Sequence, residues 1–337
     1  MHGENQLGGK EHGIEAGTVD RHTSLRNCAF AIMNKQIDTT APMPDWAAEA
    51  LAMPCRSGFL DVHGCAVHYL AWGDTTMPPL MLIHGNAASA EWWRFVAPLL
   101  ASEYHVIAPD LGGMGDSAHC GRYERERYVE QVMAVADTLA PGLPPFILGH
   151  SLGGYVAIMA GCAHSERMAG LLILDSPARE PDGTTFAPKV NSSPVPKIYK
   201  DRATALQRFK LLPEQPVNCG FYLDHIAQTS IKEEAGGWRW KFDPAATSQQ
   251  RRLDFVQDLL DMHCPVSLMW GGLSERFDDF ARGITRSAFG GIYPLVEIPN
   301  ARHHVMLDEP LALVTALRTQ LAIWRIGSSS RKRKPQP

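Results

Sequence analysis

Ser151 has the sequence surroundings of a nucleophilic serine. It is the central residue of the stretch Gly149-His150-Ser151-Leu152-Gly153, which directly follows the apolar run 146–148 and opens a helical pattern. A serine on a sharp turn from a strand to a helix needs small residues two positions to either side, because larger side chains would clash in the strained turn that exposes the hydroxyl. The two glycines meet that requirement and indicate a nucleophile elbow. A GxSxG pattern also arises by chance, so further loops must support it.

Two adjacent histidines near the carboxyl end are candidates for the general base. His303 and His304 follow the last predicted strand and precede a helix that begins near Glu309. A loop at that place can return an imidazole to the serine, which gives the chain order serine, acid, histidine. We favour His303 as the base, with His304 as the alternative base or a packing residue.

The acid that would orient the histidine has several candidates. Glu275 is preferred because it lies in the loop that follows the predicted strand 266–270. Asp175 ends an earlier predicted strand and is the alternative, although a turn-stabilising role is expected for it. Asp278 and Asp279 are further candidates, expected at the exposed start of a helix, where carboxylates interact favourably with the helix dipole.

Backbone amides near the serine are expected to bind a developing oxyanion. His84-Gly85-Asn86 ends another apolar run. The backbone N–H groups of Asn86 and Leu152 are the predicted oxyanion hole. Two other interpretations stay open, because His84-Gly85 is also typical of a tight turn and the Asn86 side chain could point at substrate.

The elements that must position these residues alternate between short apolar runs and helical patterns. Continuous apolar runs are typical of strands that are covered on both faces. Their alternation with helices predicts an α/β fold with a doubly wound, mostly parallel sheet. The predicted strands are 58–62, 66–72, 80–84, 105–109, 146–149, 171–174, 266–270 and 295–299, and the predicted helices between them are 91–101, 123–140, 152–163 and 311–324.

The organisation along the chain follows from these elements. We predict a flexible N-terminal arm over residues 1–43, a core over 44–176 and 263–326, a helical cap over 177–262 and a basic C-terminal tail over 327–337. The cap has helix-like segments at 203–212 and 223–231 but no convincing buried strand. An insertion at this point would lie over the carboxyl ends of the strands, where open α/β sheets bind ligands.

Composition narrows the classes of partner. The formal net charge of the 337 residues is only −4 and the charges are dispersed, so a nucleic-acid partner is not expected. The first 40 residues lack the apolar run of a signal peptide, and no stretch is long enough for a membrane span. We therefore expect a cytoplasmic protein, with a homodimer left open.

The seven cysteines do not form a recognisable framework. Their number is odd and no CxxC pair occurs, which fits neither a set of disulfides nor a zinc site. We expect reduced, mostly structural thiols.

The ordered motifs resemble the α/β-hydrolase superfamily over residues 44–326. Besides the elbow, the chain contains Pro109-Asp110-Leu111-Gly112-Gly113-Met114-Gly115-Asp116-Ser117, similar to the family's D-x-x-G-x-G-x-S loop. The stretch from His303 to Pro310 is similar to the closing H-x-x-x-x-x-x-P, which selects His303. The acid loop departs from the family pattern. A W-G-x-x-D register would put the acid at Ser274, whereas a G-x-x-S-D register puts Glu275 in place of the aspartate.

This resemblance implies a serine hydrolase that needs no cofactor and no metal. A serine at position 151 differs from the aspartate with which the related haloalkane dehalogenases and epoxide hydrolases attack. We expect a carboxylesterase-like enzyme that hydrolyses a small to medium apolar ester or lactone through an acyl-enzyme on Ser151. Trp92, Trp93, His150 and Trp238 are the predicted substrate-binding residues, although aromatic residues more often pack in the core.

Three other activities and one non-catalytic role stay open at this point. The same residues serve an acyltransferase, an amidase or a carbon–carbon bond hydrolase, because the triad does not determine the leaving group. A ligand-binding relative that has lost catalysis would also keep the pocket.

Overall fold

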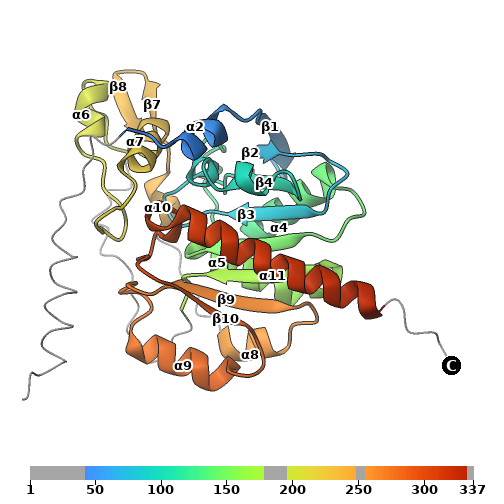
Figure 1. The fold of residues 1–337 in the computed structure, drawn as a ribbon. Helices are drawn as coiled ribbons and strands as arrows, with labels where there is room; N and C mark the ends of the chain where they lie inside the picture. Colours follow the sequence, from blue (N-terminus) through green and yellow to red (C-terminus); the bar gives the residue numbers. More distant parts are fainter. Residues whose placement is uncertain (1–41, 178–195, 248–254, 332–337) are drawn as a thin grey trace, which may run out of the picture. The chain divides into compact units, whose positions relative to one another are not determined.

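The computed structural model describes residues 42–177, 196–247 and 255–331 (Figure 1). The arm predicted over residues 1–43 lies outside this part of the chain except for its last two residues. Within the described ranges, no helix combines the length and apolar character that crossing a membrane requires.

An eight-stranded sheet forms the centre of the described chain. The strand order is β1-β2-β4-β3-β5-β6-β9-β10. The pairs β1–β2 and β2–β4 are antiparallel, and all other neighbours are parallel. The predicted α/β fold with a mostly parallel sheet is confirmed. The strands are β1 (Arg56–Val62), β2 (Cys65–Trp72), β3 (Pro79–Ile83), β4 (His105–Pro109), β5 (Phe146–His150), β6 (Gly170–Leu174), β9 (Val266–Gly271) and β10 (Leu295–Ile298).

Helices cover both faces of this sheet, which explains why its central strands read as continuous apolar runs. Met81 and Ile83 of β3 join one buried cluster with apolar residues of α4 and α5. Leu80 and Leu82 are equally buried and point to the opposite face, because successive side chains of a strand alternate. In Figure 1, α11 crosses in front of the sheet on that side. The helices outside the insertion are α2 (Asp45–Ala52), α3 (Ala97–Leu100), α4 (Arg125–Leu139), α5 (Leu152–His164), α9 (Asp279–Phe289), α10 (Val305–Asp308) and α11 (Pro310–Arg331), with short 3-10 helices η1 (Ala90–Trp93) and η2 (Ser165–Arg167).

The helix predicted over residues 91–101 is wrong as a single element. The chain instead forms η1 and then α3, with the break at Arg94–Val96. Pro98 at the start of α3 has no N–H to donate to the preceding turn, so it can begin a helix but cannot continue one.

The segment between β6 and β9 is an insertion that is not purely helical. Its described part contains α6 (Arg202–Leu206), α7 (Gly220–Thr229), β7 (Ile231–Glu234), β8 (Gly237–Trp240), η3 (Pro244–Thr247) and α8 (Phe255–Leu260). The strands β7 and β8 form an antiparallel hairpin, which the sequence prediction of helices alone did not include. Gly236 lies in the two-residue turn at φ +95°, a conformation that favours glycine. Residues 178–195 and 248–254 of the predicted cap lie outside the described ranges.

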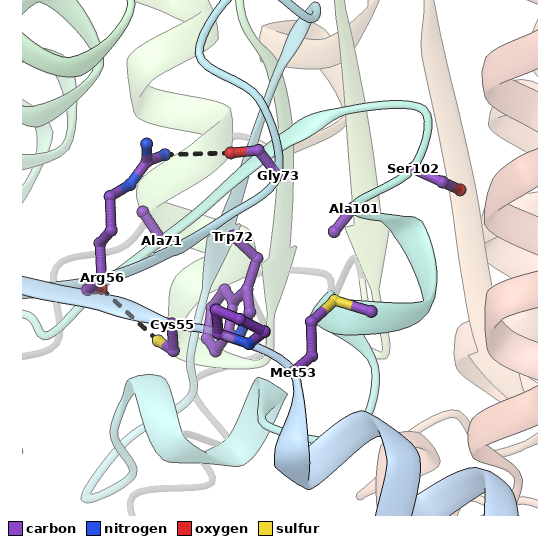
Figure 2. Close-up of a pocket in the computed structure, with 9 residues that line it drawn as sticks. Met53, Cys55, Arg56, Ala71, Trp72, Gly73, Ala101 and Ser102 are labelled. Carbon is purple, nitrogen blue, oxygen red and sulfur yellow. Dashed lines mark hydrogen bonds between the residues drawn. The ribbon is translucent and has the colours of Figure 1, made fainter.

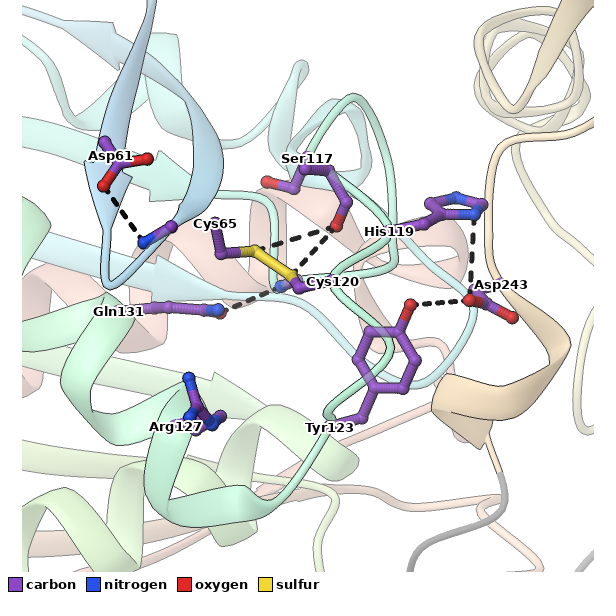
Figure 3. The surroundings of a disulfide bond; sticks show 12 residues. Asp61, Cys65, Ser117, His119, Cys120, Tyr123, Arg127, Gln131 and Asp243 are labelled. Atoms are coloured by element: carbon purple, nitrogen blue, oxygen red, sulfur yellow. Dashed lines mark hydrogen bonds and ion pairs between the residues drawn. A yellow bond between two sulfur atoms is a disulfide. The ribbon is translucent and has the colours of Figure 1, made fainter.

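One disulfide contradicts the prediction of reduced thiols. Cys65 at the start of β2 is bonded to Cys120, with a Cα–Cα distance of 5.7 Å (Figure 3). The loop after β4 folds back onto β2, where the Ala118 N–H donates to the Ala66 carbonyl at 2.8 Å. The two cysteines are 55 positions apart, so sequence spacing gave no signal for the disulfide. Cys55, Cys162, Cys219 and Cys264 are free, and Cys28 lies outside the described residues.

Candidate active site

Four loops meet at the carboxyl ends of neighbouring strands. Ser151 follows β5 and Asp175 follows β6, while the loop that carries His303 follows β10 and the loop 84–86 follows β3. The strands β3, β5, β6, β9 and β10 are consecutive in the sheet and parallel, so their carboxyl ends share one edge. Ligands of open α/β sheets bind at this edge.

The turn at Ser151 has the strained backbone that a nucleophile elbow requires. Ser151 has φ 54° and ψ −116°, and the helix α5 begins at the next residue. A Cβ atom on Gly153 would lie 2.5 Å from the carbonyl oxygens of Ile83 and His84, and one on Gly149 would overlap with the Gly153 carbonyl. The two glycines therefore allow the helix to approach β3 and β5 closely enough to leave the Ser151 side chain on the outside of the turn.

His303 connects the serine to a buried carboxylate. Its Nε2 lies 3.1 Å from Ser151 Oγ, and its Nδ1 lies 2.8 Å from Asp175 Oδ1. A neutral imidazole that donates Nδ1–H to the carboxylate has a lone pair on Nε2 and can accept the hydroxyl proton. The arrangement of these three side chains is that of a serine–histidine–aspartate triad.

The acid beside His303 is Asp175 and not the preferred Glu275. Asp175 is completely buried, whereas the Glu275 side chain is exposed. Asp175 has φ 46°, so a turn at the end of β6 directs it across the edge of the sheet, much as the elbow directs Ser151. The prediction of Glu275 is corrected on this geometry. One feature of the sequence could have indicated Asp175 as the acid. Asp175 comes directly after a buried strand, and that strand neighbours the strand of Ser151.

Three donors converge on the Asp175 carboxylate. Besides His303, the Ser274 hydroxyl donates to Oδ1 at 2.7 Å and the Gly271 N–H donates to Oδ2 at 2.9 Å. These bonds compensate a buried charge. Sequence reasoning considered Ser274 only as the position of a missing acid and did not assign it this contact. Of the other acid candidates, Asp278 caps α9 by accepting the Ala281 N–H at 2.9 Å, and Asp279 is exposed on the first turn of that helix.

The two neighbouring histidines hold the His303 loop and border the insertion. His150 donates from Nε2 to the His303 carbonyl at 2.8 Å, and His304 donates from Nε2 to the Pro213 carbonyl at 3.1 Å. Burial lowers the pKa of both imidazoles well below the usual value, so both are neutral near pH 7. His304 thus contacts the insertion twice, because its backbone N–H also donates to the Gln215 amide oxygen at 2.9 Å. The geometry selects His303 over His304 as the partner of the serine.

The loop 84–86 lies against the serine. A Cβ atom on Gly85 would stand only 3.3 Å from the Ser151 Cβ. His84 holds this loop, because its Nδ1 donates to the Gly85 carbonyl at 2.7 Å and its Nε2 accepts the Leu111 N–H at 3.0 Å. Leu152 is the first residue of α5, where a backbone N–H has no acceptor within the helix.

The predicted substrate-binding residues occupy three different environments. Trp92 is buried beside the histidines, with its ring centroid 5.0 Å from that of His304, and Trp93 is completely buried in the core. Trp238 lies on the hairpin strand β8, where its ring is near the Arg202 guanidinium. Of the predicted residues, Trp92 and His150 thus lie next to the triad.

The insertion is attached next to these loops by polar contacts. Tyr222 of α7 is buried and donates its hydroxyl to the Trp92 carbonyl. His225 contacts the Glu91 carboxylate at 2.7 Å. The Asp308 carboxylate accepts hydrogen bonds from the Asn218 N–H at 3.3 Å and from the Gln215 amide at 3.1 Å. Figure 3 shows a further contact away from the triad, between Tyr123 and Asp243.

A separate pocket contains none of the triad residues (Figure 2). Its charged lining residue, Arg56, is engaged with the protein, because the guanidinium donates to the Gly73 carbonyl at 3.2 Å and contacts His105 Nε2 at 2.8 Å. We therefore assign no chemistry to it. The pocket is lined by Met53, Pro54, Cys55, Arg56, Ala71, Trp72, Gly73, Ala101 and Ser102.

Known proteins resemble this chain in sequence and in fold. Pimeloyl-[acyl-carrier protein] methyl ester esterase of Aeromonas hydrophila is 28% identical over 247 residues, which cover 69% of this chain and 91% of that protein. Esterase Rv0045c of Mycobacterium tuberculosis is 26% identical over 271 residues, or 76% of this chain and 87% of that protein. The solved structure of this esterase has a TM-score of 0.64 at 22% identity and covers 85% of this chain and 98% of that chain.

Other relatives match a shorter stretch. Serine hydrolase-like protein of Homo sapiens is 34% identical over 110 residues, 32% of this chain. The chain spans only 54%, 35% and 53% of the length of this protein, of a second human serine hydrolase-like protein and of a Vibrio atlanticus methyl ester esterase.

The family model described as the alpha/beta hydrolase family matches residues 80–317, which is more than half of the chain. The strand order, the elbow and the serine–histidine–aspartate geometry agree with that match. The chain therefore belongs to the α/β-hydrolase family.

Proposed function

We propose that the chain is a serine hydrolase that cleaves a carboxylic ester or a lactone through an acyl-enzyme on Ser151. The observation that carries the proposal is the position of His303, whose two ring nitrogens lie 3.1 Å from Ser151 Oγ and 2.8 Å from Asp175 Oδ1. In this assignment Ser151 is the nucleophile, His303 is the general base and Asp175 is the orienting acid.

Acylation begins with transfer of the hydroxyl proton. His303 Nε2 takes the proton of Ser151 as Oγ forms a bond to the carbonyl carbon of the substrate. The tetrahedral intermediate then collapses, and the imidazolium gives the proton to the leaving alkoxide. Water repeats the sequence on the acyl-enzyme, which releases the acid and restores the serine.

Asp175 holds the imidazole in the required tautomer. Its carboxylate accepts Nδ1–H and stabilises the imidazolium without being protonated itself. Burial of this contact makes it stronger than an exposed one, because little water screens the charge.

The backbone N–H groups of Asn86 and Leu152 are proposed to bind the oxyanion. The close approach of Gly85 to Ser151 supports this role: a Cβ on Gly85 would stand 3.3 Å from the Ser151 Cβ, so the loop after β3 lies next to the nucleophile. The insertion is proposed to be a cap over the acyl pocket, and Trp92 and His150 are proposed to border that pocket.

The names of the relatives favour an ester substrate. Two are esterases and match most of their own length. Carbon–carbon bond cleavage is the second candidate, favoured by a 36% identity over 103 residues to 2-hydroxymuconate semialdehyde hydrolase of Pseudomonas. A cytoplasmic location and a homodimer remain predictions.

Covalent labelling tests the proposal directly. A fluorophosphonate probe is expected to label the wild-type chain and to leave Ser151→Ala unlabelled. Hydrolysis of p-nitrophenyl esters of several chain lengths should fall to the background rate in the same variant. Equal labelling of the two proteins would reject the nucleophile, and turnover of 2-hydroxymuconate semialdehyde in preference to every ester would favour carbon–carbon cleavage.

A further inference from the structure

Three buried histidines lie around the nucleophile, and each could offer a nitrogen lone pair to a metal ion. One ring nitrogen from each of His150, His303 and His304 lies within 4.8 Å of the others. All three side chains are at least nine-tenths buried. Imidazole is a preferred ligand of Zn²⁺ and Cu²⁺, and a set of three is typical of zinc sites that keep a fourth position open.

The hydrogen bonds of each ring decide which nitrogen is free. His150 and His304 each use Nε2 against a backbone carbonyl, which only accepts, so Nε2 carries the hydrogen in both rings. The lone pair of each neutral ring is then on Nδ1. Both Nδ1 atoms are buried without a hydrogen-bond partner. Buried polar atoms are normally satisfied, so these two nitrogens are available to a ligand.

His303 supplies the third lone pair. Its Nδ1 contacts Asp175, which leaves Nε2 as the acceptor beside Ser151. Each of the three rings is thus held from behind by a carboxylate or a carbonyl, as metal-binding histidines usually are. Tetrahedral zinc with bonds of about 2.0–2.1 Å needs nitrogens about 3.3 Å apart, so binding requires the rings to move closer together than the 4.8 Å within which their nitrogens lie.

We propose that His150, His303 and His304 bind a transition-metal ion such as Zn²⁺, and that this ion inhibits the enzyme. The metal and the catalytic proton compete for the same lone pair on His303 Nε2. With the metal bound, Ser151 has no base to take its proton. The inhibition rests on the proposed function, whereas the binding of the metal does not.

A second group of possible ligands is a weaker candidate. His68, Asp110 and Asp116 also lie close together. The Asp110 oxygens already accept from His68, from the Ala90 N–H at 2.5 Å and from the Asp116 N–H at 2.8 Å. Asp116 pairs with Lys241 at 2.7 Å. Neither His68 nor Asp110 has a buried side-chain atom without a partner, whereas His150 and His304 each have one.

The test compares Zn²⁺ binding and inhibition in matched variants. His304→Gln and His150→Gln keep an amide donor where Nε2–H donates, but have no ligand atom in place of Nδ1. We expect one Zn²⁺ per wild-type chain by calorimetry, inhibition that EDTA reverses, and no inhibition by Mg²⁺, which prefers oxygen ligands. Each glutamine variant should weaken binding and inhibition about tenfold or more, with inhibition expressed relative to the activity of that variant without metal.

Controls separate the site from the rest of the surface and from the proposed function. His263→Gln removes an exposed histidine and should change neither value. Ser151→Ala should still bind Zn²⁺, and Co²⁺ in place of Zn²⁺ should give a visible tetrahedral spectrum in that protein. Thermal unfolding of each variant shows whether it is folded. If one of the two glutamine variants does not fold, the other still tests the metal site.

Each outcome has a definite meaning. Zn²⁺ binding that the two glutamine substitutions leave unchanged, or activation by Zn²⁺, would overturn the proposal. Binding lost in those variants, in a chain that hydrolyses no substrate and reacts with no fluorophosphonate, would support the metal site and reject the proposed function.

Discussion

The Ser274 hydroxyl donates to Asp175 Oδ1 at 2.7 Å, and the same oxygen accepts Nδ1–H of His303 at 2.8 Å. Ser274 is the position that the W-G-x-x-D register of the family gives to the acid. The strands β6 and β9 are parallel neighbours, so the residues that follow them lie side by side. The carboxylate therefore reaches His303 from β6, while a hydroxyl from the loop after β9 holds the carboxylate.

Neutralising Asp175 should abolish most of the activity. Asp175→Asn is expected to lower kcat by about 10³–10⁴-fold, because the asparagine does not hold the productive imidazole tautomer. Glu275→Gln is the matched control and should stay within about twofold of wild type, since the Glu275 side chain is exposed. Steady-state hydrolysis of a p-nitrophenyl ester measures both. A larger loss of kcat in Glu275→Gln than in Asp175→Asn would assign the role of the acid to Glu275.

Removing the Ser274 hydroxyl should have a smaller effect. Ser274→Ala deletes one of three donors to a buried carboxylate, which is worth about 1.5 kcal/mol or roughly tenfold in kcat. KM should be unchanged, because Ser274 acts through Asp175 and His303. A change in KM alone would assign Ser274 to substrate binding.

Moving the carboxylate to position 274 should restore part of the activity. In the double variant Asp175→Asn, Ser274→Asp, the acid stands where the family pattern has it. We expect kcat to recover at least about tenfold over Asp175→Asn alone, which is roughly 1.4 kcal/mol of transition-state stabilisation. Kinetics of the single and double variants on one ester decide the matter, and no recovery would mean that position 274 does not reach His303.

The elbow glycine should be intolerant of a side chain. Gly149→Ala would place a Cβ into the backbone of Gly153, so we expect a loss of about 1–3 kcal/mol in the free energy of unfolding and weaker fluorophosphonate labelling. Gly283→Ala in α9 is a matched control, because a Cβ there meets no atom within 4 Å. That variant should be slightly more stable than wild type. Urea unfolding compares the two, and equal stabilities would contradict the close approach at Gly149.

Asp308 should make the protein less stable as the pH rises from about 4 to about 6. Burial raises the pKa of its carboxyl from 3.8 to about 6, against the lowering effect of the Arg302 N–H. Between these values the folded chain holds a proton that the unfolded chain has released, so unfolding becomes easier with increasing pH. The full effect is roughly 3 kcal/mol, at 1.36 kcal/mol per pKa unit.

Urea unfolding of wild type and Asp308→Asn over this pH range isolates that effect. The difference in free energy of unfolding, wild type minus variant, should fall from about pH 4 to 6 and be flat above about pH 7. A difference that rises over the same range would show that the hydrogen bonds to Asp308 outweigh its burial.

The sequence alone determined the strands of the main sheet and the position of the elbow. A strand covered on both faces must be apolar at successive positions. Runs such as 80–83 and 171–174 could therefore be predicted to be strands from the sequence. The elbow was equally local, because the turn at Ser151 needs glycine two residues to either side. The choice of His303 also came from the sequence, because its spacing to Pro310 resembles the closing motif of the family.

Only the tertiary structure decided which distant residues meet. Asp175 and Glu275 both follow strands near Ser151, and no spacing separates them. The difference lies in the turn at φ 46° that directs Asp175 towards His303 and in the exposure of Glu275. Two other contacts could likewise not be predicted from the sequence. They are the disulfide between Cys65 and Cys120 and the proximity of His150 to His304. Local patterns report the conformation of a few consecutive residues, whereas such contacts depend on loops that come together only when the sheet has formed.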